Sequence, residues 1–179
     1  MMLEPFDLVL VDDSISDARI IQRALDEVGI AHRLTHYLDG ASALEGLVAE
    51  LQTRSGRSGR PHLTLLDLNL PGLDGLQILA AIKSDPLLRV MPVVILTTSG
   101  RDEDVSRAYA LGANSYLLKP EEFARYRELI LALKGFWFEF AVQPARSRSA
   151  EPPIPDPSER RSGAGDQYGE AFEKRRGRE

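Results

Sequence analysis

The chain has 179 residues and a formal net charge of −5, and 43% of its residues are hydrophobic while 27% are charged. This composition is typical of a soluble globular protein, and the net negative charge gives no reason to expect nucleic-acid binding. The chain has no cysteine, which excludes disulfides and thiolate metal sites and favours the reducing cytoplasm. No apolar stretch is long enough to cross a bilayer, so no membrane partner is expected.

The chain alternates between short apolar runs, typical of strands, and apolar residues at helical spacing. In chain order, this pattern predicts a strand at 6–11, a helix at 20–28, a strand at 34–38, a helix at 41–51, a strand at 62–66, a helix at 76–82, a strand at 92–96, a helix at 105–111, a strand at 115–118 and a helix at 123–140. Gly29 and Gly112 are expected to end two of the helices. The last helix is expected to carry its aromatic residues along one side.

Strands that alternate with helices in this way predict an α/β fold. The strand at 92–96 reads Pro-Val-Val-Ile-Leu without polar alternation, which is typical of a strand buried on both faces of a parallel sheet. Because crossovers between parallel strands are right-handed, the natural topology is a flavodoxin-like, doubly wound, five-stranded parallel sheet with strand order 2-1-3-4-5. We expect this domain to span residues 5–144.

Two segments are expected to lack regular structure. Residues 145–179 are rich in proline, arginine and glutamate and hold few large apolar residues, which predicts a disordered tail. Residues 53–61 contain two Ser-Gly pairs and predict a flexible loop. The tail is too polar and too rich in proline for a helix-turn-helix, so no nucleic-acid partner is expected.

Five polar side chains directly follow the predicted strands. They are Asp12 and Asp13 after the first strand, Asp67 after the third, Thr97 after the fourth and Lys119 after the fifth. The carboxyl ends of parallel strands meet at one edge of a doubly wound sheet, where such folds bind ligands. Three carboxylates repel one another and call for a cation, and Mg²⁺ suits oxygen ligands of this kind. Asp67, on the central strand, is the candidate nucleophile for forming an acyl phosphate, and Thr97 and Lys119 are candidate partners for phosphoryl oxygens.

Each of these residues also has a structural interpretation. A single aspartate after a strand is more often a helix cap or a turn former, and we expect that role for Asp39 and Asp74. The five side chains that follow the strands, however, all fall at the one edge where this fold binds ligands. Their joint placement therefore favours the functional interpretation.

Four segments together resemble the receiver domain of bacterial two-component response regulators. They are the pair Asp12 and Asp13, the phrase LLDLNLPGLDG at 65–75, PVVILTTSG at 92–100 and YLLKP at 116–120. The resemblance covers about residues 6–142, and it implies that Asp67 accepts a phosphoryl group from a sensor histidine kinase. It also implies that Asp12, Asp13 and Asp67 bind Mg²⁺ with the backbone carbonyl of Asn69, and that Thr97 and Lys119 contact the phosphoryl oxygens.

The resemblance further implies a conformational switch. Phosphorylation is expected to draw the Thr97 hydroxyl inward and to let Tyr116 rotate into the space that it leaves. Pro120 takes the place of a proline that follows a cis peptide bond. Thr98 stands where the family usually has alanine or glycine. Because of its bulk beside the phosphate entrance, we do not expect the dephosphorylation rate that is usual in the family.

The end of the predicted domain is rich in aromatic residues. The segment KGFWFEFAVQP at 134–144 resembles the ending of single-domain response regulators that are paired with phytochromes and form homodimers. This likeness implies a bacteriophytochrome as a candidate kinase and a homodimer whose interface includes Phe136, Trp137 and Phe140. In the structural interpretation, these rings complete the hydrophobic core, which must hold for some of them.

The predicted function is therefore a phosphoacceptor that signals through protein contacts, not an enzyme beyond catalysing its own phosphorylation and dephosphorylation. One alternative is a relay shuttle that passes its phosphoryl group to a histidine phosphotransfer protein. A hydrolase with an aspartate nucleophile ranks low, because that class needs a second aspartate two residues later as general acid, where Asn69 stands. A module that is never phosphorylated is disfavoured by the presence of all five site residues.

Overall fold

The computed structural model describes residues 5–53 and 63–142 of the chain. The strands are β1 (Phe6–Val11), β2 (His32–Tyr37), β3 (Leu63–Leu66), β4 (Val93–Thr97) and β5 (Ser115–Leu118). The helices are α1 (Ile15–Val28), α2 (Gly40–Thr53), α3 (Gly75–Ser84), α4 (Asp102–Ala110) and α5 (Phe123–Leu133), followed by a π-helical segment, η1 (Lys134–Phe140). The predicted tail at 145–179, and all but the first residue of the predicted loop at 53–61, lie outside the described residues.

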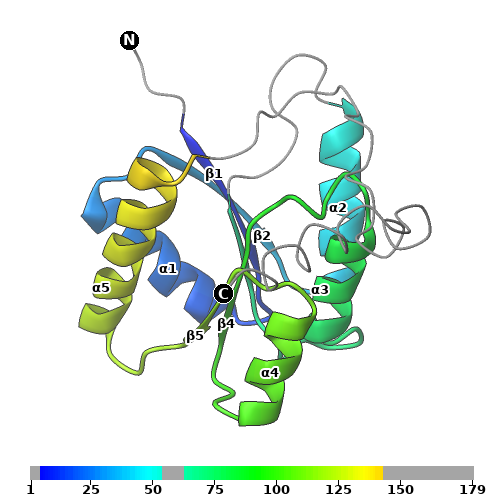
Figure 1. Cartoon of the computed structure of the whole chain (residues 1–179). Coiled ribbons are helices and arrows are strands. Elements are labelled where there is room, and N and C mark those ends of the chain that lie inside the picture. The colour runs from blue at the N-terminus through cyan, green and yellow to red at the C-terminus, as the bar shows by residue number, and fades with distance from the viewer. Residues whose placement is uncertain (1–4, 54–62, 143–179) are drawn as a thin grey trace, which may run out of the picture. The chain divides into compact units, whose positions relative to one another are not determined.

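The strands form one parallel sheet in the order β2-β1-β3-β4-β5 (Figure 1). Figure 1 shows α1 and α5 on one face of this sheet and α2, α3 and α4 on the other. The predicted α/β, flavodoxin-like, doubly wound topology is therefore confirmed. Within the described ranges, no helix is both long and apolar enough to cross a membrane.

The apolar runs of the central strands are explained by burial on both faces. Toward α1 and α5, the strands present Leu8, Leu10, Leu63, Leu65, Val94 and Leu96. Toward α2, α3 and α4, they present Val9, Val11, Leu66, Val93 and Ile95. Each of these side chains is at most 2% exposed. Because successive side chains point to opposite faces, a strand between two helical layers favours apolar residues at nearly every position, and the buried Thr64 of β3 is an exception.

Three helix ends have the capping residues that the sequence predicts, although α1 and α4 begin earlier than predicted, at Ile15 and Asp102. The side chain of Asp74 caps α3, accepting a hydrogen bond of 2.8 Å from the backbone N–H of Gln77. Asp39 precedes α2 and accepts a hydrogen bond of 2.9 Å from the backbone N–H of Ser42. The structural roles predicted for both aspartates are thus confirmed. Gly29 ends α1 in the left-handed conformation, with φ of 69°, which favours glycine.

The predicted helix at 123–140 divides into two segments, because α5 ends at Leu133 and η1 continues as a π-helix. Trp137 and Phe138 pack against the core beneath α1 and α5, whereas Phe136 and Phe140 are 58% and 79% exposed. The expectation that the rings share one side is therefore wrong. A π-helix has more residues in each turn than an α-helix, so α-helical spacing no longer decides which side chains share a face.

Candidate functional site

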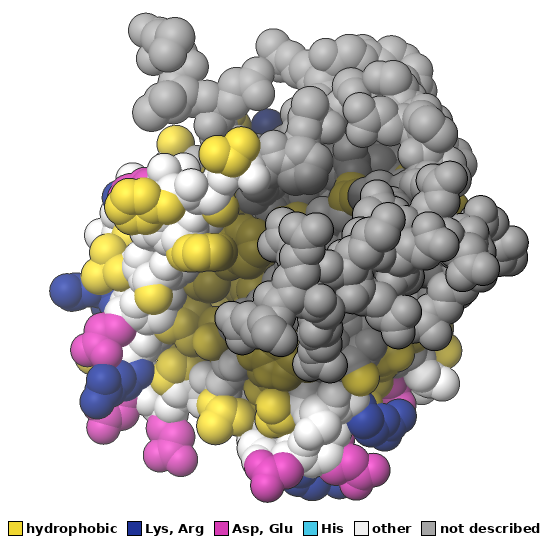
Figure 2. All heavy atoms as spheres, viewed as in Figure 1, with side chains coloured by type: hydrophobic (Ala, Val, Ile, Leu, Met, Phe, Trp, Pro, Cys, Tyr) yellow, Lys and Arg dark blue, Asp and Glu magenta, His cyan; other side chains and the backbone are white. Residues whose placement is uncertain are grey.

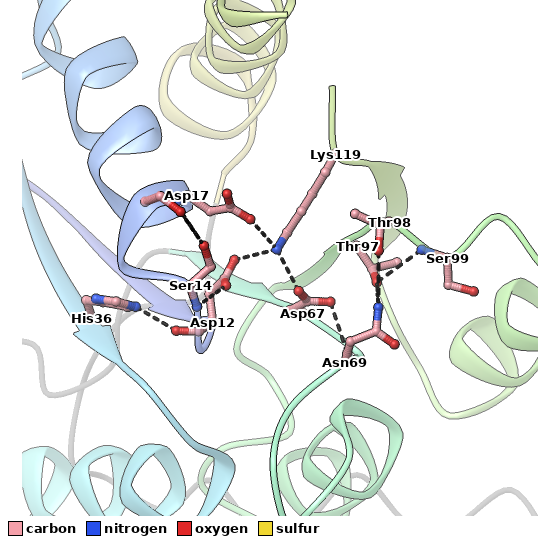
Figure 3. Close-up of polar contacts among 11 residues, drawn as sticks. Asp12, Ser14, Asp17, His36, Asp67, Asn69, Thr97, Thr98, Ser99 and Lys119 are labelled. Atoms are coloured by element: carbon pink, nitrogen blue, oxygen red, sulfur yellow. Dashed lines mark hydrogen bonds and ion pairs between the residues drawn. The ribbon is translucent and has the colours of Figure 1, made fainter. Parts of the chain in front are cut away.

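The register of the sheet brings the predicted site residues to one edge. The backbone N–H of Asp67 donates to the carbonyl of Val11 (2.9 Å), so Asp12 and Asp67 leave adjacent strands side by side. On the neighbouring strand pair, the N–H of Lys119 donates to the carbonyl of Thr97 (2.8 Å). The carboxyl ends of β1, β3, β4 and β5 thus present their polar side chains to one another (Figure 3).

Three carboxylates form a cluster with the donor chemistry of a divalent-cation site. One ligand oxygen from each of Asp12, Asp13 and Asp67 lies within 4.8 Å of the others. Asp12 is fully buried and Asp67 is 4% exposed, while Asp13 is exposed. Burial raises the pKa of Asp12, although contacts with Lys119 oppose that rise. Asp12 Oδ2 is buried and accepts no hydrogen bond within the described part of the chain, so it fits a metal ligand.

The ammonium of Lys119 lies among the carboxylates. Its Nζ donates to Asp67 Oδ2 (2.6 Å) and to Asp17 Oδ2 (2.8 Å). Nζ also lies 2.8 Å from Asp12 Oδ2, an ion pair that lacks hydrogen-bond geometry. The side chain is only 6% exposed. Burial on its own lowers the pKa of Lys119, but the contacts with Asp12, Asp17 and Asp67 outweigh burial and hold that pKa above its usual range. Lys119 is therefore charged at neutral pH.

Asn69 links the nucleophile candidate to the end of β4. Its backbone N–H donates to Asp67 Oδ1 (3.0 Å), and its side-chain Nδ2 donates to the hydroxyl oxygens of Thr97 (3.3 Å) and Thr98 (3.2 Å). The N–H of Ser99 also approaches Thr97 Oγ1 (3.4 Å). Thr97 is fully buried, and its oxygen serves as an acceptor in both contacts. The proton of its hydroxyl can thus be donated to an acceptor that binds beside Asp67.

Tyr116 connects β5 to the loop between β4 and α4. Its hydroxyl donates to the carbonyl of Ser99 (2.8 Å), and its backbone N–H donates to the hydroxyl of Tyr109 (3.2 Å). Tyr116 is half-buried and packs against the core on the α4 side of the sheet. The ring is therefore in contact with the segment that follows Thr97, as a switch would require. Its rotation on phosphorylation stays a prediction.

Two aspartates that the sequence analysis did not single out have a place in this network. Asp17 is the second hydrogen-bonded partner of Lys119. Asp104 accepts hydrogen bonds from Ser99 Oγ (2.5 Å) and from both Nε and Nη2 of Arg101, and these contacts lower its pKa. Both aspartates lie in the first turn of a helix, where acidic residues are common because their negative charge interacts favourably with the helix dipole. Because a first-turn aspartate has this ordinary explanation, the sequence gives no sign that Asp17 contacts the distant Lys119.

One further sequence prediction has a structural outcome. None of the peptide bonds in residues 5–53 and 63–142 is cis, so the predicted cis bond before Pro120 is wrong, and the bond has the trans form that X–Pro bonds generally prefer. The aromatic residues of η1 do not join the site. Phe138 stacks on Phe6, the first residue of β1, which places η1 at the opposite edge of the sheet.

The chain matches a known family. The family model of the response regulator receiver domain matches residues 8–131. The chain belongs to this family. Among curated relatives, the receiver domain is similar to the response regulator Rcp1 of Synechocystis sp., with 40% identity over 141 residues that cover 79% of this chain and 95% of Rcp1. It is also 40% identical, over 79% of this chain and 89% of the relative, to a probable methanogenesis regulatory protein, FilR2, of Methanothrix harundinacea.

Solved structures show the same likeness. The phosphorylated cyanobacterial phytochrome response regulator RcpA matches this receiver domain with a TM-score of 0.68 and 35% identity, over 79% of this chain and 99% of RcpA. The Mn²⁺-bound form of Rcp1 matches with a TM-score of 0.67 and 39% identity, over 79% of this chain and 100% of Rcp1. The predicted resemblance to receiver domains, and to phytochrome response regulators among them, is confirmed.

Proposed function

We propose that this receiver domain accepts a phosphoryl group on Asp67 from a histidine kinase, with Mg²⁺ bound by Asp12, Asp13 and Asp67. The observation that carries the proposal is the setting of Asp67, which is 4% exposed and lies beside two further carboxylates and a buried ammonium. An oxygen-only cluster of this kind suits Mg²⁺. The solved Mn²⁺-bound form of Rcp1 supports a divalent cation in this family.

In the proposed reaction, a carboxylate oxygen of Asp67 attacks the phosphorus of a phosphohistidine. The new P–O bond forms as the P–N bond breaks. The electron pair of the P–N bond stays with the imidazole, which takes up a proton. Bound Mg²⁺ supplies positive charge that offsets the negative charge on the transferring group. In the metal-free protein, the N–H of Asn69 holds Oδ1 of Asp67 and Lys119 holds Oδ2, so the plane of the carboxylate is fixed before its ligands arrive.

The same residues are suited to holding the phosphorylated state. The proposal gives Lys119 and the hydroxyl of Thr97 the phosphoryl oxygens as partners, because one is a permanent cation and the other has a proton to donate. Thr97 is joined through Ser99 to the hydroxyl of Tyr116. A shift of Thr97 toward the phosphoryl group would therefore strain the contact that holds Tyr116, which is a physical route for signalling to α4 and β5.

Labelling with acetyl phosphate, or with a cognate kinase, tests this proposal. We expect Mg²⁺-dependent labelling of the wild type and no labelling of Asp67→Asn. Asp39→Asn is a matched control, because the same substitution there changes an aspartate that precedes α2 and leaves the cluster intact. Label that persists in Asp67→Asn, or that forms equally well in EDTA, contradicts the proposal.

A bacteriophytochrome is the proposed kinase, and the likeness to the phytochrome response regulator RcpA supports this choice. We expect phosphotransfer from a bacteriophytochrome kinase to be faster than from an unrelated histidine kinase at equal concentrations. Equal rates from both would remove the support for a phytochrome partner. The cytoplasmic location predicted from the sequence stays a prediction.

We also propose that the protein forms a homodimer through its last segment. Phe136 and Phe140 of η1 are 58% and 79% exposed, and Leu131 of α5 is 46% exposed. Figure 2 shows hydrophobic side chains gathered over the C-terminal end of α5 and in the hollow between α5 and α4. A second copy is the proposed occupant, because a twofold axis lets the same patch cover itself. Trp137, the third residue predicted for the interface, is half-buried against the core and would contribute its remaining exposed edge.

Light scattering at micromolar concentration tests the dimer. We expect the double variant Phe136→Ser, Phe140→Ser to be monomeric, because both rings are exposed and their loss leaves the core intact. Leu87→Ser is the control, since Leu87 is 55% exposed between α3 and β4. Deletion of residues 145–179 should leave the dimer intact if the domain spans 5–144, as we propose. A monomeric wild type, or a dimeric double variant, would rule the interface out.

A further inference from the structure

Lys119 has three carboxylate partners, and they differ in what the proposed function requires of them. Asp12 and Asp67 belong to the cluster whose ligand oxygens converge within 4.8 Å. Asp17 does not belong to this cluster. It comes from the first turn of α1, and its Oδ2 accepts a hydrogen bond of 2.8 Å from Lys119 Nζ (Figure 3). Within the described ranges, Asp17 is thus the one carboxylate partner of Lys119 that a cation bound at the cluster does not occupy.

A cation and Lys119 compete for the same oxygens. Lys119 contacts Oδ2 of Asp12 at 2.8 Å and Oδ2 of Asp67 at 2.6 Å. A metal ion that binds these carboxylates repels the ammonium and takes up their lone pairs. Phosphorylation of Asp67 then converts its carboxylate into an acyl phosphate. Because Lys119 is almost fully buried, it needs a remaining charged partner while the cation is bound and until the phosphoryl oxygens arrive.

We propose that Asp17 is a positioning residue that keeps Lys119 in place while Mg²⁺ and the phosphoryl donor occupy the carboxylates of Asp12 and Asp67. This inference rests on the proposed function and adds a residue to it. With Asp17 present, Lys119 gives up one strong hydrogen bond to Asp67 and retains another. Its ammonium then stays within reach of the group that arrives on Asp67.

The surroundings of Asp17 fit this role. Its backbone N–H donates to Ser14 Oγ (3.1 Å), the hydrogen bond that caps α1, so the start of the helix is fixed without help from the carboxylate. The side chain is 26% exposed, which keeps its charge partly hydrated. A carboxylate on a capped helix end is held at a constant place, whereas the carboxylates of the cluster change partners as ligands bind.

The ammonium signal of Lys119 in proton–nitrogen correlation spectra provides a test that uses Mg²⁺ alone. A buried, hydrogen-bonded ammonium exchanges its protons slowly enough to be seen. The chain has four lysines, and Lys83 offers an internal reference because its Nζ donates to the carbonyl of Met91 (2.8 Å) on another part of the fold. We expect the Lys119 signal of the wild type to persist when Mg²⁺ saturates the site.

In Asp17→Asn, we expect the Lys119 signal to be present without metal and to be lost on saturation with Mg²⁺, through proton exchange at least about tenfold faster, a factor that corresponds to about 1.4 kcal/mol. Asp26→Asn is the matched control, because Asp26 is an exposed aspartate at the other end of the same helix. Asp17→Glu, which restores the charge, should restore the signal. An unchanged Lys83 signal in each variant shows that the fold is intact.

Three results would overturn the inference. The first is a Lys119 signal that persists in Mg²⁺-saturated Asp17→Asn. The second is loss of the wild-type Lys119 signal when Mg²⁺ is added. The third is absence of the Lys119 signal from the metal-free wild type. Failure of the proposed function gives a different result. In that case, Mg²⁺ shifts none of the backbone signals of Asp12, Asp13 and Asp67, whatever residue occupies position 17.

Discussion

Repulsion among the carboxylates of the acidic cluster should lower the free energy of unfolding of the metal-free protein. The substitution Asp13→Asn tests this expectation. Asp13 lies with Asp12 and Asp67 in a cluster of oxygens within 4.8 Å of one another. Lys119 contacts the other two aspartates of the cluster. Replacing Asp13 with asparagine removes one negative charge and leaves the shape of the side chain nearly unchanged.

The size of the effect follows from the geometry. Two unit charges 4.8 Å apart repel by about 0.9 kcal/mol in water and by about 3.5 kcal/mol at an effective dielectric constant of about 20. Asp13 is exposed, so the lower figure applies to each of its two neighbours, and the charge of Lys119 offsets part of the sum. We therefore expect Asp13→Asn to raise the free energy of unfolding by about 1 kcal/mol without metal, or about 2–4 °C in melting temperature.

In excess Mg²⁺, the wild type should be more stable than Asp13→Asn. A ligand at about 100 times its dissociation constant stabilises the native state by about 2.7 kcal/mol, and Asp13→Asn has lost a carboxylate ligand. Thermal unfolding in EDTA and in excess Mg²⁺ measures both effects, with Glu121→Gln as a control that removes an exposed charge in the turn before α5. A variant that is less stable than the wild type in EDTA, or that gains as much from Mg²⁺, would refute the electrostatic argument.

Three further outcomes are expected. Gly75→Ala should lower the free energy of unfolding in urea by about 1–3 kcal/mol, because a Cβ there would collide with the backbone at the end of β3. Asp104→Asn should be less stable than the wild type at neutral pH. Because the pKa of Asp104 is lowered in the fold from 3.8, its stabilisation is complete above that pH and is lost as the pH falls through the lowered pKa, so melting temperatures should converge in acid. Thr98→Ala should shorten the lifetime of the phosphoryl label severalfold, because it removes one of the two hydrogen bonds of Asn69 Nδ2 and exposes Asp67 to water, while Thr98→Ser should keep the lifetime of the wild type.

Much of the fold follows from the sequence, because burial on both faces of a strand produces a clear pattern. β1 and β5 have the bounds that their apolar runs predict, β3 begins one residue later than predicted, and β4 begins and ends one residue later. The predicted strand at 34–38 begins two residues earlier, at His32. β2 lies at the edge of the sheet and is only partly buried, so its polar residues blur the pattern there.

The site could be predicted as a set of residue types at one edge of the sheet. Parallel strands bring their carboxyl ends together whatever the details of packing, so the amino-acid sequence alone is enough to group Asp12, Asp67, Thr97 and Lys119. The partners of each side chain could not be predicted in this way. The contact between Asp17 and Lys119 joins residues 102 positions apart.

Features that depend on packing between distant segments could be read only from the folded structure. Whether η1 is α-helical or π-helical is settled by which rings fit against the core, where Phe138 meets Phe6 from the other end of the domain. An acidic residue in a first helical turn looks the same in sequence whether it favours the helix dipole or holds a lysine. Local periodicity encodes burial, but a hydrogen bond between distant side chains depends on where the packed helices and strands place them.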